Sequence, residues 1–394
     1  MQLYNCIFFI KKMYSFSYSD LFKAYYDCLK NKRNSKNAIK FSLDKYDNLI
    51  ELCDEINNGQ YKIGKSKAFI ISYPKYREIF AADFRDRIVH HLVIGELMPY
   101  FEKYFIKESF SCMKNRGILY GVKTIEEHIC DCSQNYINKT YILKMDIQSF
   151  FMNIDKNLLA NMLDNFISNE YPNNKKKNCL RELCKQIIMH HPEENCELLS
   201  PIDDWKKLGK GKSLFDVGND KGLAIGNLTS QVFANFYLTV LDYYIKNELN
   251  IKYYGRYVDD LILIHNDKEH LKLCIKKIRK FLNNNLLLSI NPNKIYLQLA
   301  THGVNFIGAT IMPNRTYCGN RTINAFINKL NSTYKKYDIN YKDKFISSVN
   351  SYFGLMKHYS TYNIRKKIFK KYCSEEWKKY IKISKNLTKI NLLN

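Results

Sequence analysis

The sequence predicts an α+β fold in which a small antiparallel sheet is combined with many helices. A short apolar run at 141–147 and a strand–turn–strand pattern at 251–265 have the spacing of sheet strands. Longer stretches, including 19–60 and 83–106, repeat apolar residues at helical intervals. The chain has 394 residues, which is more than one core requires, so we expect two or three subdomains.

The other segments complete this expected order of elements. In chain order they are short extended segments at 61–82, a polar insertion at about 165–222 with one helix inside, helical spacing at 228–249, a helix at about 267–284, short strands to about 312, and a basic helical region from 320 to the end.

The charge of the chain indicates a polyanionic partner. Lys and Arg number 62 against 38 Asp and Glu, a net charge of +24, and such an excess repels itself in a compact protein. Nucleic acid is the simplest partner, because each cation on a phosphate releases counterions. An anionic membrane surface, or no partner, is the alternative. From 320 onward there are 17 Lys and Arg against 4 Asp and Glu, a net +13.

The cysteines and the N-terminal residues predict a cytoplasmic protein. None of the 12 cysteines has the C-x2-C spacing of a zinc site, and we expect reduced thiols rather than a disulfide framework. The apolar run Leu3–Ile10 is too short to span a bilayer and lacks the features of a signal peptide. We therefore expect a soluble protein that uses no membrane.

Two adjacent carboxylates, Asp259 and Asp260, form the centre of the expected site. Apolar strands on both sides place them at a hairpin turn. Adjacent acids repel each other, and placing them between buried strands is costly unless a cation is present. Mg²⁺ prefers hard oxygen ligands of this kind. An ordinary Asp-rich turn is the alternative interpretation.

A third carboxylate, Asp146, ends the apolar run 141–145 and lies 113 residues before Asp259. A strand-end Asp and a hairpin Asp pair could together hold two ions ~3.5–4 Å apart, an arrangement that suits phosphoryl transfer. The alternative for Asp146 is a helix N-cap or a surface acid.

Four motifs in this order resemble a reverse transcriptase over about residues 20–370. They are Leu143-Lys-Met-Asp-Ile-Gln-Ser-Phe-Phe151, Gly226-Asn-Leu-Thr-Ser-Gln231, Tyr257-Val-Asp-Asp260 and Gly303-Val-Asn-Phe-Ile-Gly308. Ile225 before this glycine, and Gln231 where most relatives have Pro, are similar to the subfamily of diversity-generating retroelements. So are Trp205, Lys212-Ser-Leu-Phe215 and Gly222-Leu-Ala-Ile-Gly226, although Ala224 stands where that subfamily usually has Pro.

The resemblance implies a right-hand polymerase fold. Its parts would be an N-terminal extension at 1–19, fingers at 20–140, a palm with an antiparallel sheet at 141–312 that includes the polar insertion at about 165–222, and a basic helical thumb at 313–394. The charge of the thumb suits a template–primer duplex, which is recognised through its backbone and shape.

The resemblance also implies roles for individual residues at the reacting centre. The metal positions match Asp146, Ile147, Asp259 and Asp260, and would hold two Mg²⁺ ions, with Mn²⁺ as a possible substitute. Lys294 matches the lysine proposed to protonate the leaving pyrophosphate; the alternative is a solvated lysine.

Further matches concern the nucleotide and the primer. Phe151 matches the aromatic ring that excludes a 2′-hydroxyl, with core packing as the alternative. Arg77, Arg85 and Arg87 match the fingers segment that touches the triphosphate and the template, with ion pairs to Glu78, Asp83 and Asp86 as the alternative. The nucleotide site would also include Ile225, Gly226 and Gln231. The hairpin that holds the primer end matches Gly303, Val304, Phe306 and Gly308, with an ordinary strand turn as the alternative.

The subfamily resemblance implies an activity and partners. Such an enzyme copies a template repeat RNA into cDNA from deoxynucleoside triphosphates, with errors at template adenines, and the cDNA replaces a variable repeat. It acts on an RNA–DNA duplex with a small basic pentameric protein, the accessory variability determinant. Ile225 stands where many reverse transcriptases have Gln, and its missing amide predicts looser fidelity.

Two other classes of function remain open from the sequence. One is a retron, abortive-infection or group II intron reverse transcriptase; an intron-encoded protein would normally add a maturase region, for which 394 residues leave little room. The other is a polymerase-fold RNA-binding scaffold without activity, against which the complete Asp set argues.

Overall fold

The computed structural model describes residues 15–30, 32–73, 75–335 and 337–393, which fall into two compact units. Unit 1 holds the described residues up to Ile106, with Ile147–Tyr244 and Ile278–Ile290, and unit 2 holds Lys107–Asp146, Ile245–Lys277 and the chain from Asn291 onward. The apolar run Leu3–Ile10 and most of the expected extension at 1–19 lie outside the described residues. The fingers, palm and thumb boundaries stay a prediction.

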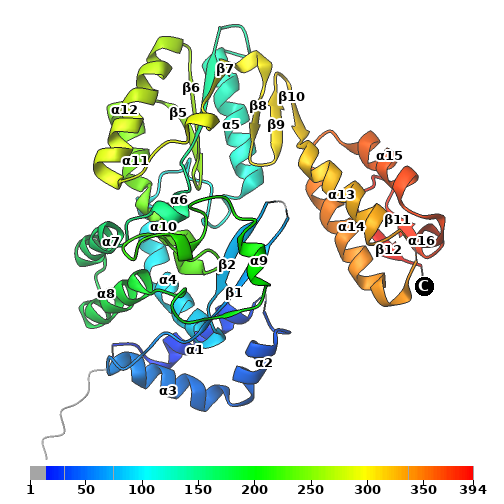
Figure 1. Ribbon diagram of the computed structural model, residues 1–394. Coiled ribbons are helices and arrows are strands. Elements are labelled where there is room, and N and C mark those ends of the chain that lie inside the picture. Colours follow the sequence, from blue (N-terminus) through cyan, green and yellow to red (C-terminus); the bar gives the residue numbers. More distant parts are fainter. Residues whose placement is uncertain (1–14, 31, 74, 336, 394) are drawn as a thin grey trace, which may run out of the picture. The chain divides into compact units, whose positions relative to one another are not determined.

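Unit 2 is built on a four-stranded antiparallel sheet in the order β5-β6-β3-β7. Figure 1 labels β5, β6 and β7 of this sheet. Its strands are β3 (Tyr141–Asp146), β5 (Tyr253–Tyr257), β6 (Asp260–His265) and β7 (Tyr296–Leu299). Helix α5 (Ile118–Ser133) packs on β5 because Gly255 has no side chain: an added Cβ would lie 2.7 Å from atoms of Ile125 and Phe110. The strand–turn–strand predicted at 251–265 and the strand predicted at 141–147 are confirmed.

The rest of unit 2 extends the same hydrophobic core. A second antiparallel sheet contains β8 (Val304–Phe306), β9 (Ala309–Met312) and β10 (Arg315–Cys318). The helices α13 (Asn320–Ser332), α14 (Lys342–Met356), α15 (Tyr362–Tyr372) and α16 (Glu375–Lys379) follow. The expectation of helix alone after 320 is wrong, because a hairpin of β11 (Ile381–Ile383) and β12 (Ile390–Leu392) ends the chain. Ile381 and Ile390 of this hairpin are buried in the core around Trp377.

Unit 1 combines helices with a three-stranded sheet in the order β2-β1-β4. Strands β1 (Ser66–Ile71) and β2 (Arg77–Ala81) form an antiparallel hairpin, which confirms the extended segments expected at 61–82. The helices before and after this hairpin are α1 (Tyr18–Leu29), α2 (Lys36–Leu43), α3 (Lys45–Asn57) and α4 (Phe84–Tyr104). They agree with the helical spacing read at 19–60 and 83–106.

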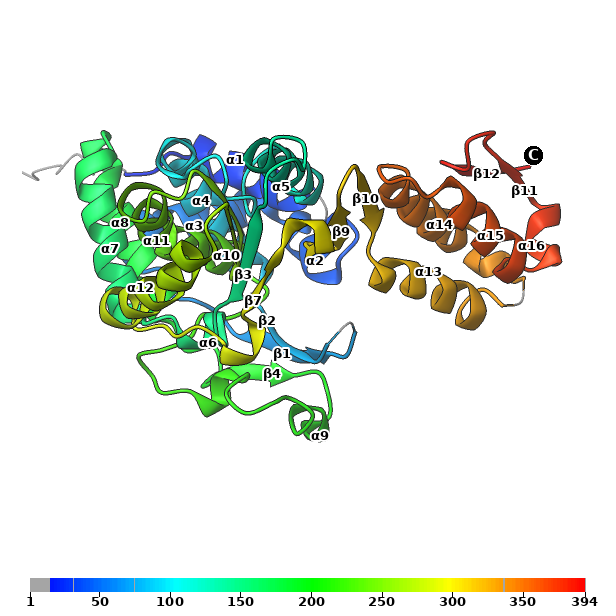
Figure 2. The ribbon, with the colours of Figure 1, turned by 90° about the horizontal axis from the view of Figure 1, so that it is seen from above.

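The polar insertion at about 165–222 is more structured than the sequence suggested. The expectation of one helix is wrong: α7 (Lys156–Glu170) enters the segment, and α8 (Asn174–Met189), α9 (Ile202–Trp205) and a 3-10 turn at Leu214–Asp216 lie inside it. Strand β4 (Cys196–Leu198) also lies there and pairs in parallel with β1. Figure 2 shows β4 alongside β1, and α7 beside α8. A polar composition concealed these elements, because their buried residues are few.

The remaining α-helices of the described residues are α6 (Phe150–Asn153), α10 (Leu228–Tyr237), α11 (Thr239–Tyr243) and α12 (Lys268–Leu286). A π-helix at Tyr244–Glu248 continues α11. These confirm the helices expected at 228–249 and near 267–284, and the α+β class as a whole. Among the described residues, no helix is long and apolar enough to cross a membrane. The cysteines that the structure describes are all free thiols.

Candidate active site

Three carboxylates meet at one end of the unit 2 sheet. Strand β3 ends at Asp146, which lies directly opposite Asp260, the first residue of β6. Asp259 occupies the turn between β5 and β6. Because antiparallel pairing brings the end of β3 to the start of β6, residues 114 positions apart in sequence become neighbours. The strand-end and hairpin positions expected for these three residues are both confirmed.

The turn that holds Asp259 is fixed by a buried arginine. Val258 has a φ of 56°, which is an uncommon conformation for a β-branched residue. The Arg256 guanidinium, fully buried, donates from Nη1 to the Val258 carbonyl at 3.2 Å. The Arg256 backbone is itself held, since its N–H donates to Glu108 O and its carbonyl accepts from Phe110 N. The unusual conformation of Val258 is therefore stabilised by the Arg256 side chain, and the Arg256 backbone is in turn fixed by Glu108 and Phe110.

Crowding of negative charge changes the acidity of this site. Burial, with the neighbouring charges of Asp146 and Asp260, raises the pKa of Asp259 to about 6. Burial is also the main reason that the pKa of Asp260 is raised, and Lys144 partly offsets it. In both cases the ionised form is disfavoured, which is the behaviour of carboxylates that lack a sufficient counter-charge.

Two lysines provide part of the missing positive charge. Lys294 Nζ lies 2.7 Å from Asp146 Oδ2, and Lys144 Nζ lies 3.4 Å from Asp260 Oδ1. Burial opposes the charge on Lys294, yet the contact with Asp146 and the other two carboxylates raise its pKa overall. Lys294 is placed by a 3-10 turn whose Asn291 N–H donates to the Asp146 carbonyl at 2.9 Å. Lys294 is therefore in direct contact with the carboxylate site, while its expected role as a proton donor stays a prediction.

The donor set has the chemistry of a divalent metal site, although the side chains are turned toward the lysines. Within the described residues, no group of three or more His, Cys, Asp or Glu side chains is arranged to hold a metal ion. The hard oxygens of Asp146, Asp259 and Asp260 nevertheless fit such an ion, and the raised pKa values show that more positive charge would be favourable. Ile147 is buried, so only its backbone carbonyl could contribute.

The hairpin expected to hold a primer end is tied to the same carboxylates. Gly303, Val304, Phe306 and Gly308 lie on or beside strands β8 and β9 of unit 2. Val304 and Phe306 point into the core, which leaves the backbone and Gly308 for any ligand. Lys144 Nζ, the partner of Asp260, also donates to the Asn305 carbonyl at 3.1 Å. One lysine thus joins the hairpin to the acidic site.

The expected nucleotide loop lies in unit 1 against the β1–β2 hairpin. Phe80 N donates to the Ile225 carbonyl at 2.8 Å, and an added Cβ on Gly226 would lie 2.8 Å from Phe80 O. With a φ of 127° as well, Gly226 has little tolerance for a side chain. Gln231 is exposed in the first turn of α10, while the side chains of Thr229 and Ser230 face inward.

Phe151 and Ile225 meet in one small core. Both are partly buried against a cluster that contains Phe80 and Leu214. The Phe151 ring also lies 5.5 Å from the ring of Phe150. Phe151 is thus partly packed and partly accessible, and both the sugar-selecting role and the packing role are compatible with its position. The structure brings these two residues together, while the carboxylates belong to unit 2.

The three fingers arginines occupy different environments. Arg77 is exposed at the start of β2. Arg85 forms an ion pair with Glu55, a partner that the sequence did not indicate, and its guanidinium lies over the Tyr61 ring. Arg87 donates from Nε to the Ala82 carbonyl at 2.8 Å. Of the suggested acidic partners, Asp86 accepts from Tyr61 and Gly64, and Asp83 caps the helix at the Arg85 N–H.

Sequence reasoning missed Lys144 and Arg256. Lys144 lies two residues before Asp146 on the same strand, so the period of two puts both on one face. That spacing could have identified it. Arg256 carries no comparable signal, because the sequence does not distinguish a buried guanidinium in a strand from an exposed one.

Comparisons with known proteins cover the segment that holds this site. The family model described as reverse transcriptase (RNA-dependent DNA polymerase) matches residues 63–311, a span that holds the three carboxylates, Lys294 and Gly303–Gly308. The chain is 20% identical to Protein YkfC of Escherichia coli over 68% of this chain and 72% of that protein. It is 22% identical to the putative COX1/OXI3 intron 2 protein of Saccharomyces cerevisiae over 72% of this chain, but over only 36% of that protein.

Among solved structures, the chain is similar to telomerase from Candida albicans in complex with a fragment of telomeric RNA. The TM-score is 0.45 at 12% identity, with 78% of this chain and 55% of that chain covered. Apo telomerase from Candida tropicalis gives a TM-score of 0.47 at 12% identity, again with 78% and 55% covered. The chain spans about half the length of these structures. On the match of the family model to well over half of its residues, the chain belongs to the reverse transcriptase family, the RNA-directed DNA polymerases, and has the right-hand polymerase class of fold.

Proposed function

We propose that this protein copies an RNA template into DNA at the carboxylates Asp146, Asp259 and Asp260. The observation that carries the proposal is the crowding of these three groups at one sheet end, where two lysines only partly balance them. Bound Mg²⁺ would lower the pKa of a primer 3′-hydroxyl and neutralise the triphosphate and the leaving pyrophosphate. Lys294, beside Asp146, would then give a proton to that pyrophosphate.

Primer extension on an RNA template tests this proposal. The full chain is supplied with primer, deoxynucleoside triphosphates and Mg²⁺, with and without EDTA. Synthesis that requires both the RNA template and the metal supports the proposal, and Mn²⁺ added after EDTA shows whether the ion can be exchanged. A protein that binds the template–primer but extends nothing under any metal would instead be a polymerase-fold scaffold.

We further propose that the enzyme serves a diversity-generating retroelement. The support is the form of the loop Ile225–Gln231 and of the approach to it, which includes Trp205 and Gly222. The template would be a repeat RNA, copied in the cytoplasm with errors mainly at adenines, and a basic pentameric accessory protein would assist. Ile225 has no amide to hydrogen-bond near the incoming nucleotide. Losing about 0.5–1.5 kcal/mol of discrimination raises errors a few-fold but does not by itself select adenine.

Deep sequencing of the cDNA tests the subfamily. The enzyme, its own template RNA and the accessory protein should give misincorporation mainly opposite adenines, and Ile225→Gln should reduce it. Ile295→Gln, at another partly buried isoleucine, is the matched control and should leave the errors as they are. An error rate at adenine no higher than at the other three bases contradicts the retroelement assignment and leaves the polymerase assignment intact.

A reverse transcriptase of the group II intron type is the second candidate. The similarity to the yeast intron 2 protein, over 72% of this chain, favours it. Retron and abortive-infection enzymes belong to the same alternative. The same cDNA experiment separates them, since accurate copying at adenine is the expectation for each.

A further inference from the structure

A small cavity inside unit 1 lies beside the expected nucleotide loop, Ile225–Gln231. Its volume is about 30 Å³. Residues from the start of β1, from α4, from the end of α8 and from the first turn of α10 line it, and all of them belong to unit 1. The cavity therefore joins the nucleotide loop to α4 and to the polar insertion, which the proposed chemistry does not use.

The wall of this cavity contains polar atoms that lack hydrogen bonds. Among the residues that the structure describes, His90 Nδ1, His190 Nε2 and Thr229 Oγ1 are buried and have no hydrogen-bond partner in the protein. All three residues line the cavity. His90 is 4% exposed and Thr229 is fully buried. Leaving a buried polar group without a partner is costly, so three such atoms around one cavity indicate a ligand that satisfies them.

The protein fixes the backbone on the insertion side of the cavity. His190 follows the last residue of α8, and its carbonyl accepts from Lys156 Nζ at 3.1 Å. Lys156, on α7, is only 2% exposed, and its Nζ also lies 3.2 Å from His191 Nδ1. The main chain that carries the His190 ring is therefore held in one place.

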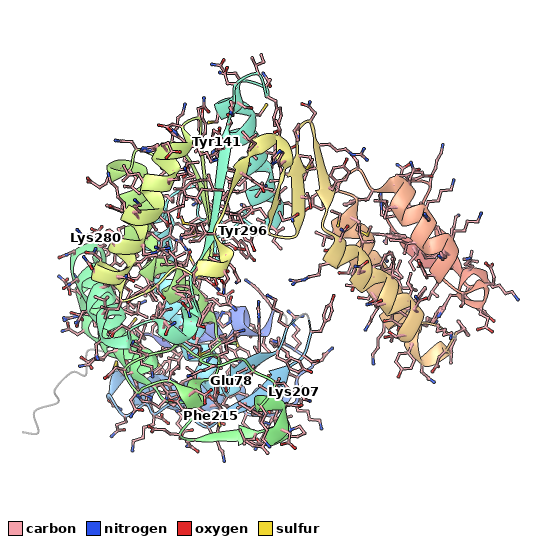
Figure 3. The ribbon with its side chains drawn as sticks, turned by 45° about the horizontal axis from the view of Figure 1, so that its top comes forward. Glu78, Tyr141, Lys207, Phe215, Lys280 and Tyr296 are labelled. Carbon is pink, nitrogen blue, oxygen red and sulfur yellow. The ribbon has the colours of Figure 1, made fainter. Side chains whose placement is uncertain are left out.

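A buried carboxylate fixes the rest of the insertion to the β1–β2 hairpin. Glu78 of β2 is 1% exposed and accepts from Trp205 Nε1 at 2.7 Å, Ser213 Oγ at 2.6 Å and the Leu214 N–H at 2.7 Å. Figure 3 shows Glu78 of the hairpin and Phe215 of the insertion in one region. Because a carboxylate with satisfied oxygens specifies one arrangement, the insertion is a fixed support for the cavity.

The first turn of α10, on the opposite wall, lacks a side-chain cap. Asn227 precedes this helix but makes no capping hydrogen bond, and its Oδ1 instead accepts from the Ala82 N–H at 3.2 Å. The first N–H groups of a helix have no partner inside the helix. A hydrogen-bonding ligand in the cavity would serve both this turn and the Thr229 hydroxyl.

The size and the charge of the cavity indicate that this ligand is water. A volume of about 30 Å³ has room for one or two water molecules, since roughly 10–15 Å³ is enough for one. Burial, together with the neighbouring His91, Arg87 and His190, lowers the pKa of His90 to about 3. A cation in the cavity would be disfavoured for the same reasons as this proton. Neutral imidazoles and a hydroxyl suit a neutral ligand that both donates and accepts.

We propose that ordered water in this cavity links His90, His190 and Thr229, and that His90 is a positioning residue for the nucleotide loop. The water joins α4 and the insertion to the first turn of α10 by hydrogen bonds. It thereby restricts the loop Ile225–Gln231, and a restricted loop loses less entropy when a nucleotide binds. The inference rests on the proposed role of this loop in binding the nucleotide, and the three residues act through the loop without contacting the nucleotide.

An isosteric substitution distinguishes a hydrated cavity from a dry one. Thr229→Val exchanges the hydroxyl for a methyl group of similar size. If water binds the hydroxyl, the unfolding equilibrium constant, measured by urea denaturation, should rise about 5-fold. If the cavity is dry, the substitution removes an unsatisfied polar atom, and a variant as stable as the wild type or more stable overturns the inference.

Thr316→Val is the matched control for this substitution. Thr316 Oγ1 is also buried without a partner, but it belongs to β10 and does not line the cavity. The control should therefore be at least as stable as the wild type. A control that loses as much stability as Thr229→Val would show that the loss does not depend on the cavity, and it would overturn the inference.

Nucleotide kinetics separate positioning from a purely structural role. His90→Leu should raise the KM for deoxynucleoside triphosphates about 5-fold, with kcat and the template–primer Kd within about 2-fold of the wild type. His90→Asn keeps a polar atom near the position of Nδ1 and should restore most of the KM. His91→Leu, at the next residue of α4, does not alter the cavity lining and should leave the KM unchanged. A parallel loss of kcat and template–primer affinity would show general damage and overturn the positioning role.

Coupling and direct observation complete the test. His90→Leu/Thr229→Val should raise the KM by less than the product of the single effects, because both side chains use the same water. A crystal structure that resolves ordered water should show it within hydrogen-bonding distance of His90 Nδ1 and Thr229 Oγ1. An empty cavity, or a metal ion in it, overturns the inference.

Failure of the proposed function has a different signature. A wild type that holds water in the cavity, and loses stability as expected in Thr229→Val, but synthesises nothing contradicts the proposed polymerisation. An active wild type whose His90→Leu and Thr229→Val variants keep the normal KM for nucleotides overturns the positioning role instead.

Discussion

Two acidic sites with raised pKa values, one in each unit, differ in what surrounds their carboxylates. Glu78, in unit 1, is buried with three hydrogen-bond donors from the insertion. Asp259, in unit 2, is buried beside two other carboxylates. Burial is the largest cause of the raised pKa in both. A raised pKa alone therefore does not distinguish a structural acid from a functional one.

The two sites differ in whether the protein supplies hydrogen-bond donors or counter-charges for the buried carboxylate. Donors from Trp205, Ser213 and Leu214 all lower the pKa of Glu78 and so oppose the effect of its burial. The neighbours Asp146 and Asp260 increase the effect of burial on Asp259. A satisfied carboxylate maintains a fold, whereas an unsatisfied cluster needs a further cation and is stable only at a cost. Substitutions at the two sites should thus have opposite effects on activity and stability.

The largest effect is expected for Asp259→Asn. If the cluster binds the catalytic ions, RNA-templated synthesis should fall by at least about 1,000-fold, because several kcal/mol of charge stabilisation are lost. Primer extension measures it, and affinity for RNA should remain within a few-fold of the wild type. Asp131→Asn, an exposed neutralisation on α5, is the control. Loss of RNA binding together with loss of synthesis would make Asp259 a structural residue like Glu78.

Glu78→Ala should act on stability. Three donors lose their acceptor, and we expect the free energy of unfolding to decrease by about 3 kcal/mol, measured by urea denaturation. Glu78→Gln should cost less, since one oxygen can still accept. Glu197→Ala, on the exposed side of β4, removes only a surface pair with Lys67 at 3.6 Å and should cost less than about 1 kcal/mol. Unchanged stability of Glu78→Ala would remove the contrast between the two sites.

The pH dependence of stability should sharpen the same contrast. In the folded state Asp259 has a pKa of about 6, above its value in an unfolded chain. The folded protein therefore retains this proton while the unfolded chain loses it, and stability falls as pH rises from about 4 to 6. Without divalent metal, Asp259→Asn should be more stable than the wild type above pH 6, by at most about 3 kcal/mol, and equal to it near pH 3. An equal stability at all pH values would show that the lysines already neutralise the site.

The smallest effect is expected for a third charged region, the exposed lysines of α15, which are neither buried nor close to carboxylates of a crowded site. Lys366, Lys367, Lys370 and Lys371 are exposed on α15, whose Ile368 and Phe369 face the core. Replacing all four by Ala should lower the salt slope of template–primer binding by roughly 0.7–0.9 per lost phosphate contact, with little change in stability. Lys276→Ala/Lys277→Ala/Lys280→Ala, which removes three exposed lysines from α12, is the control. An unaltered slope would indicate a solvated face.

Much of the acidic site was predictable because it depends on local patterns. A strand that ends in Asp146 and a hairpin that turns at Asp259 are each visible in a few residues, and only the pairing of β3 with β6 had to be added. The C-terminal hairpin was not predictable. Its strands have three residues each, and the basic sequence around Ile381 and Ile390 has no alternation long enough to be read as a strand.

The Glu78 contacts were unpredictable for a different reason. Nothing near Glu78 in sequence indicates that Trp205 and Ser213 will satisfy it, and the sequence suggested Arg77, Arg85 or Arg87 as its partner instead. The same holds for Arg85, whose partner Glu55 lies on another helix. Such pairings depend on how segments that are distant in sequence pack against each other. A single sequence has no local pattern from which this packing can be predicted.

The pairing of β1 with β4 also affects how the chain is made. Contacts such as Ile70 with Ser200 join residues 130 positions apart. A ribosome that adds about 5–20 residues per second needs on the order of 10 s to synthesise the intervening segment, and the edge of β1 has no partner in that time. Pairings of such long range also slow folding, since a large loop must close before any contact forms. Production at reduced temperature, or with a chaperone that protects β-strands, should therefore increase the yield of folded enzyme.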